Sequence, residues 1–307
     1  MEVLTVQNIV SEIEQLKKEK NAIILAHYYV DDEVQKIADF VGDSYYLSKK
    51  ALEAKEEVIV FCGVNFMGES AKILNPTKTV IMPDDLADCP MAHMAYLDKI
   101  DEVRKQYEDL AVVCYINSTA EVKAASDICV TSSNAVKIVK ALKEKNIYFI
   151  PDENLGRYVA SQVPEKNFIF NDGFCHVHTS ITAENVLKAK EQVKDALVLV
   201  HPECKQEVVD LADYVGSTLG ILNYATASDA KNFIICTEMG ISYELKKNNP
   251  DKNFYSVGHR QFCPNMKRIT LEKVRDCMSN LNNQVELDEE LRLKANKALE
   301  RMVEVAK

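Results

Sequence analysis

Several residue types are scarce in this 307-residue chain, and each scarcity excludes a class of protein. Tryptophan is absent, and nine glycines and eight prolines are too few for a collagen-like or low-complexity chain. The few glycines also argue against an all-β fold, because the many turns of such a fold need residues with positive φ. No apolar run approaches the ~18 residues of a membrane span, so we expect no association with a membrane.

Positive charge is also scarce, since 37 basic residues face 47 acidic ones and the net charge is −10. Such a surface repels phosphate, so we expect no nucleic-acid partner. The N-terminal stretch, residues 1–21, lacks the basic segment and apolar core of a signal peptide. We therefore expect a cytoplasmic protein, in which disulfides are rare.

What the chain does contain is a threefold internal repeat of about 87 residues. Three sets of similar segments recur with the same two separations, 88 and 86 residues. Their markers are His27, Tyr115 and His201 in the first set, Ser44, Ser132 and Thr218 in the second, and Pro76, Pro164 and Pro250 in the third. Three coincidences in one register indicate a true repeat.

Each repeat alternates helical patterns with apolar, β-branched strands. Strands that are apolar on both faces and alternate with helices are typical of a parallel sheet covered by helices on both sides. We therefore predict an α/β protein with three repeated αβα three-layer sandwich units, whose parallel sheets lie around a pseudo-threefold axis. The predicted units are 1–89, 90–175 and 176–263, and a helical tail, 264–307, is expected to pack back on the first unit.

The repeat also predicts where a ligand binds, because ligands of open parallel sheets lie beyond the carboxyl ends of the strands. The residues expected at the first-strand ends are His27 with Tyr29, Tyr115 with Asn117, and His201 with Glu203. Ser44, Ser132 and Thr218 precede predicted helices. Each could be a helix N-cap alone, or the three could together form an anion site with helix N–H groups.

The nine cysteines divide into two groups. Cys89, Cys175 and Cys263 each follow the fourth strand of a repeat, at separations of 86 and 88 residues. The other six are expected to be buried or structural: Cys62, Cys114, Cys129, Cys204, Cys236 and Cys277. The first group therefore carries the candidate chemistry.

Three thiolates at equivalent strand ends suit zinc or an iron–sulfur cluster. No CxxC pair is present, which excludes a zinc ribbon or a ferredoxin-type loop. The spacing alone leaves a cluster, zinc and no metal all open. A cysteine nucleophile paired with His176 or His178 is a further alternative, but it would not explain the threefold placement.

A set of motifs in order resembles the quinolinate synthase (NadA) family over about residues 16–270: ILAHYY, VGDS, CPM, YINS, TSSNA, CHVH, HPE, ADYVGST, CTEMG and CPNMK. The resemblance implies a transferase of de novo NAD biosynthesis that condenses iminosuccinate with dihydroxyacetone phosphate to quinolinate, with loss of phosphate and water. It also implies a functional link to L-aspartate oxidase. The implied cofactor is one [4Fe–4S] cluster per chain, held by Cys89, Cys175 and Cys263, with one open iron as Lewis acid.

The same resemblance assigns roles to individual residues. The matched substrate-binding residues are His27, Ser44, Tyr115, Ile116, Asn117, Ser132, His201, Pro202, Glu203 and Thr218. The expected catalytic residues are Glu203, as general base, with Tyr29, His201 and His27. His178 matches a histidine near the cluster; the less favoured alternative is a loop histidine with a purely structural hydrogen bond.

Two rival functions remain open at this point. One is a zinc-dependent lyase or aldolase on the same scaffold. The other is a non-catalytic protein that binds a small dianion.

Overall fold

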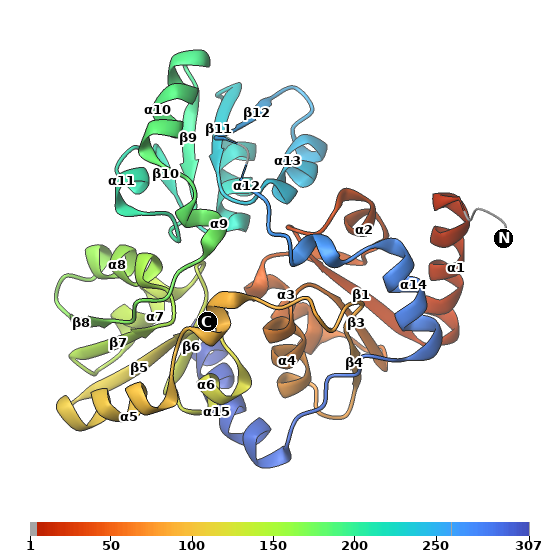
Figure 1. Cartoon of the computed structure of the whole chain (residues 1–307), viewed down its shortest axis with the longest axis horizontal. Coiled ribbons are helices and arrows are strands. Elements are labelled where there is room, and N and C mark those ends of the chain that lie inside the picture. The colour runs from red at the N-terminus through yellow and green to blue at the C-terminus, as the bar shows by residue number, and fades with distance from the viewer. Residues whose placement is uncertain (1–4, 259, 307) are drawn as a thin grey trace. The chain divides into compact units, whose positions relative to one another are not determined.

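The structure is a computed structural model that describes residues 5–258 and 260–306 (Figure 1). It divides into two compact units. Unit 1 comprises Met1–Cys89 and Pro264–Leu293, and unit 2 comprises Pro90–Cys263 and Lys294–Lys307. The two units are described separately below. The predicted boundaries between the three repeat units at residues 175 and 263 stay a prediction. Residues 1–4, 259 and 307 lie outside the described residues.

Three four-stranded parallel sheets form the cores, one in unit 1 and two in unit 2. All have the same order, with the second strand of the repeat at one edge, followed by the first, third and fourth. The strands are β1 (Ala22–His27), β2 (Phe40–Gly42), β3 (Val58–Cys62) and β4 (Thr79–Ile81) in the first repeat; β5 (Leu110–Tyr115), β6 (Ile128–Val130), β7 (Asn146–Ile150) and β8 (Asn167–Phe170) in the second; and β9 (Leu197–Val200), β10 (Tyr214–Val215), β11 (Asn232–Cys236) and β12 (Asn253–Ser256) in the third.

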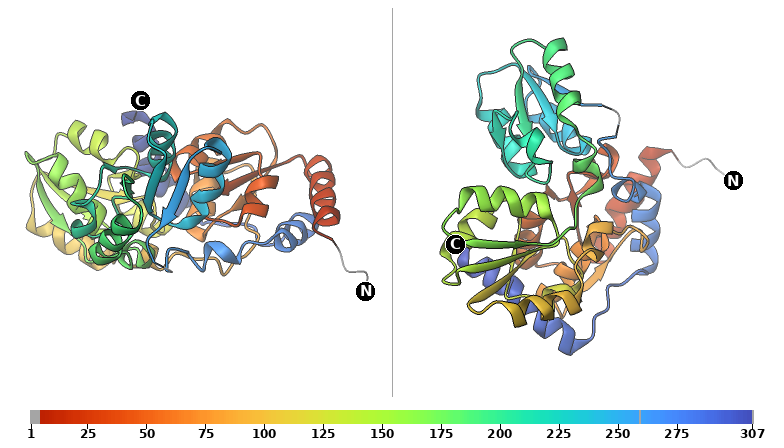
Figure 2. Two further views of the ribbon diagram at one scale, coloured as in Figure 1. Left: turned by 90° about the horizontal axis from the view of Figure 1, so that it is seen from above. Right: turned by 60° about the vertical axis from the view of Figure 1, so that its left-hand side comes forward.

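Helices flank each of these sheets (Figures 1 and 2). They are α1 (Val6–Glu19), α2 (Asp32–Ile37), α3 (Ser44–Glu53) and α4 (Asn65–Leu74); then α5 (Leu97–Gln106), α6 (Ala120–Ala124), α7 (Ala135–Ala141) and α8 (Glu153–Gln162); then α9 (His176–Thr179), α10 (Ala183–Gln192), α11 (Gln206–Val209), α12 (Thr218–Ala227) and α13 (Ser242–Asn248). The 3₁₀ turns are η1 (Pro90–His93), η2 (Met239–Ile241) and η3 (Met266–Arg268). The predicted α/β fold of three repeated αβα units is confirmed, while the pseudo-threefold axis stays a prediction.

The central strands are parallel because both of their faces are covered. Every residue of β1 and of β3 is buried; β1 contains two isoleucines and a leucine, and β3 contains two valines and an isoleucine. Such strands need helices on each side, and a connection between parallel strands is long enough to supply one.

An aspartate fixes the second strand of each repeat, which the sequence analysis did not identify. In all three sheets, the residue just before this edge strand accepts a hydrogen bond from a backbone N–H of the first strand, at 2.7–2.8 Å. The pairs are Asp39 with Ile24, Asp127 with Val112, and Asp213 with Val198. The same bond at the same place in three sheets is independent evidence for the repeat.

The C-terminal tail contains α14 (Leu271–Asn280) and α15 (Glu289–Val305). Within unit 1, α14 packs against α1. The buried carboxylate of Asp84, beyond β4, holds this part of the tail through ion pairs with Arg268 and Lys273. The last residues of the tail, from Lys294 on, are grouped with unit 2.

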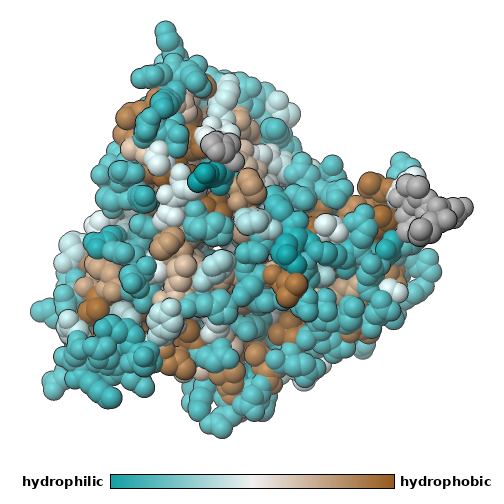
Figure 3. Space-filling model, viewed as in Figure 1, coloured by the Kyte–Doolittle hydropathy of each residue, from teal (hydrophilic) through white to brown (hydrophobic). Residues whose placement is uncertain are grey.

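Among the described residues, no helix is both long and apolar enough to cross a membrane. The face drawn in Figure 3 is mostly hydrophilic, with apolar residues scattered across it.

Candidate functional site

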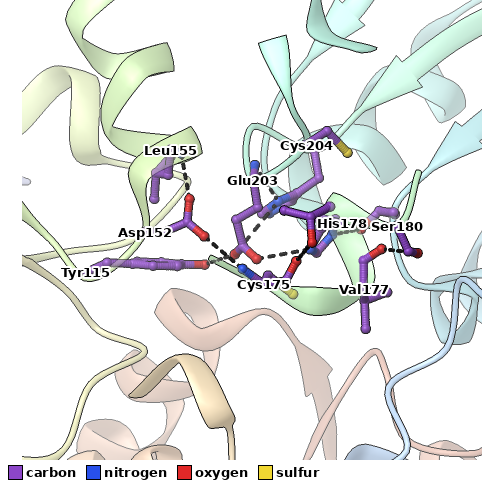
Figure 4. A network of polar contacts seen from close by, with 12 residues as sticks. Tyr115, Asp152, Leu155, Cys175, Val177, His178, Ser180, Glu203 and Cys204 are labelled. Carbon is purple, nitrogen blue, oxygen red and sulfur yellow. Dashed lines mark hydrogen bonds and ion pairs between the residues drawn. The ribbon is translucent and has the colours of Figure 1, made fainter. Parts of the chain in front are cut away.

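The first strands of the two sheets in unit 2 end in side chains that meet. Tyr115 is the last residue of β5, and Glu203 lies in the loop that follows β9. The Tyr115 hydroxyl donates a hydrogen bond to Glu203 Oε1 at 2.5 Å (Figure 4). The repeat therefore correctly predicted two of the residues that come together at the carboxyl ends of these strands.

Two imidazoles complete the surroundings of Glu203. His178 Nδ1 lies 2.9 Å from Glu203 Oε2, and His201 Nδ1 lies 3.8 Å from Glu203 Oε1. The two imidazole rings stack with centroids 4.6 Å apart. His178, His201 and Glu203 are each at most 3% exposed. The result is a buried cluster of one carboxylate, one phenol and two imidazoles.

Neighbouring groups orient both imidazoles. The backbone N–H of Glu203 donates to His201 Nδ1 at 3.3 Å, so a neutral His201 carries its proton on Nε2. On the other side of the cluster, His178 Nε2 lies 2.9 Å from the hydroxyl of Thr237, which follows β11. The third strand of the last sheet thus supports the ring that contacts Glu203.

The electrostatics of the cluster keep Glu203 ionised. Burial alone would raise the pKa of this carboxyl, but His178 and His201, together with hydrogen bonds from His178 and Tyr115, hold the pKa well below its ordinary value. Asp152, which is fully buried nearby, behaves oppositely: burial and the negative charge of Glu203 raise its pKa well above the ordinary range. Of these two carboxyls, Glu203 is therefore the one whose surroundings more strongly favour the anion.

The equivalent residues of the first repeat lie in unit 1. His27 is the last residue of β1, and its Nδ1 accepts a hydrogen bond from the backbone N–H of Tyr29 at 3.2 Å. The two rings meet edge to face with centroids 4.4 Å apart. His27 is buried, whereas Tyr29 is partly exposed. The backbone geometry around His27 therefore matches that around His201.

The three hydroxyl residues are not helix N-caps, so that alternative was wrong for each of them. The N-caps are one or two residues away, at Asp43, Asn134 and Ser217. Asp43 and Ser217 use their side chains to accept from a backbone N–H of the helix. Ser44 and Thr218 are consequently the first residues inside their helices, and Ser132 lies in the turn before α7.

The remaining predicted binding residues flank the same strand ends in unit 2. Ile116 and Pro202 are buried beside Tyr115 and His201. Asn117 is partly exposed, but its Oδ1 atom is buried without a hydrogen-bond partner in the described part of the chain. A buried acceptor of this kind is costly unless a ligand satisfies it.

Burial separates the cysteines into the two groups that the repeat predicted. Cys89, Cys175 and Cys263 are partly exposed, whereas the other six are buried. None of the nine, which lie within the described residues, forms a disulfide. Burial raises the pKa of the Cys236 and Cys277 thiols to about 12, so these cysteines stay protonated.

The three partly exposed cysteines follow loops that are held in the same way. In each repeat, a backbone N–H just beyond the third strand donates to the carbonyl two residues before the cysteine, at 2.8 Å. The donor and acceptor pairs are Asn65 with Ala87, Glu153 with Gly173, and Met239 with Gln261. The equivalent placement of the cysteines is therefore a property of the backbone as well as of the spacing.

One group in unit 2 could hold a metal ion. Ligand atoms of Cys175, His178 and Glu203 all lie within 4.8 Å of one another. Thiolate, imidazole and carboxylate are all zinc ligands, and thiolate is also the usual ligand of iron–sulfur clusters.

Sequence reasoning did not identify three buried polar residues around this site: Asp152, Thr237 and Glu238. Asp152 and Glu238 are each the second residue after the third strand of their repeat. Two acids at one repeat position, 86 residues apart, are a signal that the sequence already contained.

The fold and the cluster around Glu203 together define an α/β enzyme with a proton-transfer site at the carboxyl ends of parallel strands. The chain belongs to the quinolinate synthetase A protein family, whose model matches residues 11–304. The non-catalytic binding protein is thereby excluded.

Curated relatives match nearly the whole chain. Quinolinate synthase of Clostridioides difficile is 54% identical over 300 residues, which are 98% of this chain and 99% of the relative. The quinolinate synthase of Caldicellulosiruptor saccharolyticus is also 54% identical, over 99% of this chain and all of the relative. That of Fusobacterium nucleatum is 53% identical over 96% and 98% of the two chains.

Proposed function

We propose that this chain condenses iminosuccinate with dihydroxyacetone phosphate to form quinolinate, with loss of phosphate and water. The observation that carries the proposal is the buried, ionised Glu203 between Tyr115 and two imidazoles. The condensation needs several proton transfers, and such a cluster supplies groups that hold and release protons. The names of the relatives supply the product.

Within this proposal, the lowered pKa of Glu203 changes the role expected for it. A carboxylate that resists protonation is a weak general base, because the best base has a pKa near the working pH. Its charge instead orients the two imidazoles that contact it, those of His178 and His201. We therefore assign proton transfer to the imidazoles and the Tyr115 hydroxyl, and orientation and charge stabilisation to Glu203.

The anionic groups of the substrates need neutral or positive partners. Ser44 and Thr218 begin α3 and α12, where helix N–H groups favour an anion. The unsatisfied Asn117 Oδ1 suits an N–H or O–H donor of a substrate. We assign Ser132, Ile116, Pro202, His27 and Tyr29 to the same binding function, as the family resemblance implies.

We assign Cys89, Cys175 and Cys263 to one [4Fe–4S] cluster. The donor set fits this group, because the three thiols alone among the nine are partly exposed and follow equivalently held loops. With three protein ligands, one iron would keep an open position that supplies Lewis-acid chemistry for a substrate hydroxyl or carboxylate.

A zinc-dependent lyase is the second candidate, and the proximity of Cys175, His178 and Glu203 is the observation that favours it. However, these side chains are already engaged with one another: His178 contacts Glu203, and Glu203 also accepts from Tyr115. This mutual hydrogen bonding favours a proton-transfer cluster over a zinc site.

We propose a cytoplasmic location, because nine cysteines without a disulfide among the described residues suit a reducing compartment. Iminosuccinate must come from a reaction that oxidises aspartate, and a functional link to L-aspartate oxidase stays a prediction.

The test is product formation by anaerobically purified protein supplied with both substrates. We expect quinolinate and inorganic phosphate in equal amounts. Protein that retains its bound iron but releases neither product would contradict the proposed reaction.

A further inference from the structure

Two buried carboxylates of unit 2 occupy one position of the repeat. Asp152 follows β7 and Glu238 follows β11, each as the second residue after the strand. Both side chains are fully buried. Neither is among the residues that we assign to substrate or metal, so their burial requires another explanation.

Each carboxylate divides its two oxygens between a backbone N–H of the turn that follows it and the backbone N–H of the next partly exposed cysteine. Asp152 Oδ1 accepts from the backbone N–H of Leu155, in the first turn of α8, at 2.7 Å, and Oδ2 accepts from that of Cys175 at 3.2 Å. Figure 4 shows Asp152 between these two partners.

Glu238 repeats the arrangement. Its Oε2 accepts from the backbone N–H of Gly240, in η2, at 2.6 Å, and its Oε1 accepts from that of Cys263 at 3.0 Å. Glu238 and Cys263 are 25 residues apart in the sequence, whereas Asp152 and Cys175 are 23 residues apart. The longer acidic side chain thus belongs to the longer of the two segments.

Unit 1 provides an internal comparison, because it lacks this device. The equivalent position after β3 is Val64, whose side chain cannot accept a hydrogen bond. There the backbone N–H of Cys89 donates to Oδ1 of its own neighbour, the partly exposed Asp88, at 2.8 Å.

We propose that Asp152 and Glu238 are positioning residues, each of which fixes the backbone of one cysteine that we assign to the metal centre. The role of the cysteines rests on the proposed function, whereas the fixing of the two loops does not. A buried hydrogen bond from a peptide N–H to a carboxylate oxygen restricts the movement of that peptide. It thereby also limits the positions that the sulfur atom of the cysteine can reach. Loops ordered in advance lower the conformational entropy that metal binding would otherwise cost.

The rival explanation is that both residues only cap the turns that follow them. Asp152→Asn and Asp152→Ser separate the two roles, because Asn and Ser are as good as Asp at an N-cap but carry one acceptor oxygen in place of two. Glu238→Gln likewise keeps one acceptor oxygen. Asp172→Asn is the matched control, since it removes an exposed negative charge three residues before Cys175 without touching the buried pair.

The experiment measures how fast each cysteine reacts with N-ethylmaleimide in metal-free, full-length protein, by mass spectrometry of digested samples. We expect Cys175 to react about three- to tenfold faster in Asp152→Asn and Asp152→Ser than in the unchanged protein. We expect the same increase for Cys263 in Glu238→Gln. This size corresponds to the loss of one buried hydrogen bond. Cys89 should be unchanged in all of these variants, and all three rates should be unchanged in Asp172→Asn.

A rate that does not rise at the paired cysteine would overturn the proposal. So would an equal rise at all three cysteines, or labelling of the six buried ones, because either outcome would assign the carboxylates to general stability. A second measurement is the iron that each variant retains after a fixed time with a chelator, where we expect a faster loss than in the unchanged protein. If the unchanged protein binds no cluster, the proposed function fails, but the labelling pattern still tests the fixing of the loops.

Discussion

Two buried carboxylates, Asp84 in unit 1 and Glu203 in unit 2, resemble each other in burial and differ in their partners. They are 5% and 3% exposed, respectively. Burial would raise the pKa of both, yet neighbours lower it in both. For Asp84 these neighbours are chiefly Lys273, the backbone N–H of Leu86, and Arg268, and for Glu203 they are His178, His201 and Tyr115.

The difference between the partners indicates what each carboxylate does. Lysine and arginine stay protonated across the physiological pH range, so the ion pairs of Asp84 are permanent. Imidazole is the side chain that enzymes most often use to move protons, so the partners of Glu203 suit a reaction. Asp84 therefore holds the tail on unit 1, and we propose that Glu203 takes part in the chemistry.

Of the variants that test this difference between Asp84 and Glu203, Glu203→Gln is expected to cause the largest loss of activity. The variant keeps the shape of the side chain but removes the charge that orients the two imidazoles, to which we assign proton transfer. We expect quinolinate formation to fall by about 10²–10⁴-fold, the usual size of an acid–base contribution, with the melting temperature almost unchanged. Activity within threefold of the unchanged protein would remove Glu203 from the chemistry.

A smaller loss of activity is expected from Thr237→Val. This change keeps the branched shape but removes the hydroxyl that contacts His178 Nε2 at 2.9 Å. One hydrogen bond that orients a catalytic group contributes ~1 kcal/mol, so we expect kcat to fall by about fivefold to tenfold while the fold persists. An unchanged kcat would show that the orientation of His178 does not matter.

Asp84→Asn should have the opposite effects. Loss of the charged hydrogen bonds to Arg268 and Lys273 should lower the free energy of unfolding by about 1–3 kcal/mol, measured with urea. Activity below the melting temperature should stay within about threefold, because Asp84 is not part of the site. A large loss of activity with normal stability would break the comparison.

The contribution of Asp84 should also depend on pH in one direction. Its pKa is lowered on folding, so its stabilisation is complete above the unfolded pKa of about 3.9 and is lost as the pH falls through the folded value. The difference in stability between the unchanged protein and Asp84→Asn should therefore be constant near pH 7 and shrink below about pH 4. A difference that grows in acid would contradict the assignment.

The smallest change in the free energy of unfolding is expected for an ion pair at the surface, which serves as a reference for the buried ion pairs. Arg157 contacts Glu153 one turn earlier on α8, at 2.6 Å. Arg157→Ala should change the free energy of unfolding by about 0.5 kcal/mol or less. A loss as large as that of Asp84→Asn would mean that burial does not explain the difference.

The repeat made much of this fold predictable. Equal spacing of His27, Tyr115 and His201 placed three strand ends in register, and apolar strands between helices indicated parallel sheets. The strand order and the aspartates that fix the edge strands were not predicted, because they depend on pairing between strands. The hydroxyl residues were misplaced by a residue or two, since Asp43 and Ser217 cap more readily from the preceding position.

Some members of the cluster around Glu203 were predictable from the sequence, but the contacts between them were not. Glu203 was expected at a strand end, yet its bond to Tyr115 joins residues that are 88 apart, and that of His178 to Thr237 joins residues 59 apart. Such contacts depend on how two sheets pack within unit 2. The lowered pKa of Glu203, which shifts the expected proton transfer to its neighbours, follows only from that packing.

The most direct test of the account is an iron and sulfide count on anaerobically purified protein, with its visible spectrum. We predict brown protein with about four irons and four sulfides per chain, and loss of both from Cys89→Ser, Cys175→Ser and Cys263→Ser but not from Cys236→Ser. One zinc per chain without sulfide, or a full cluster in any of the first three variants, would contradict it.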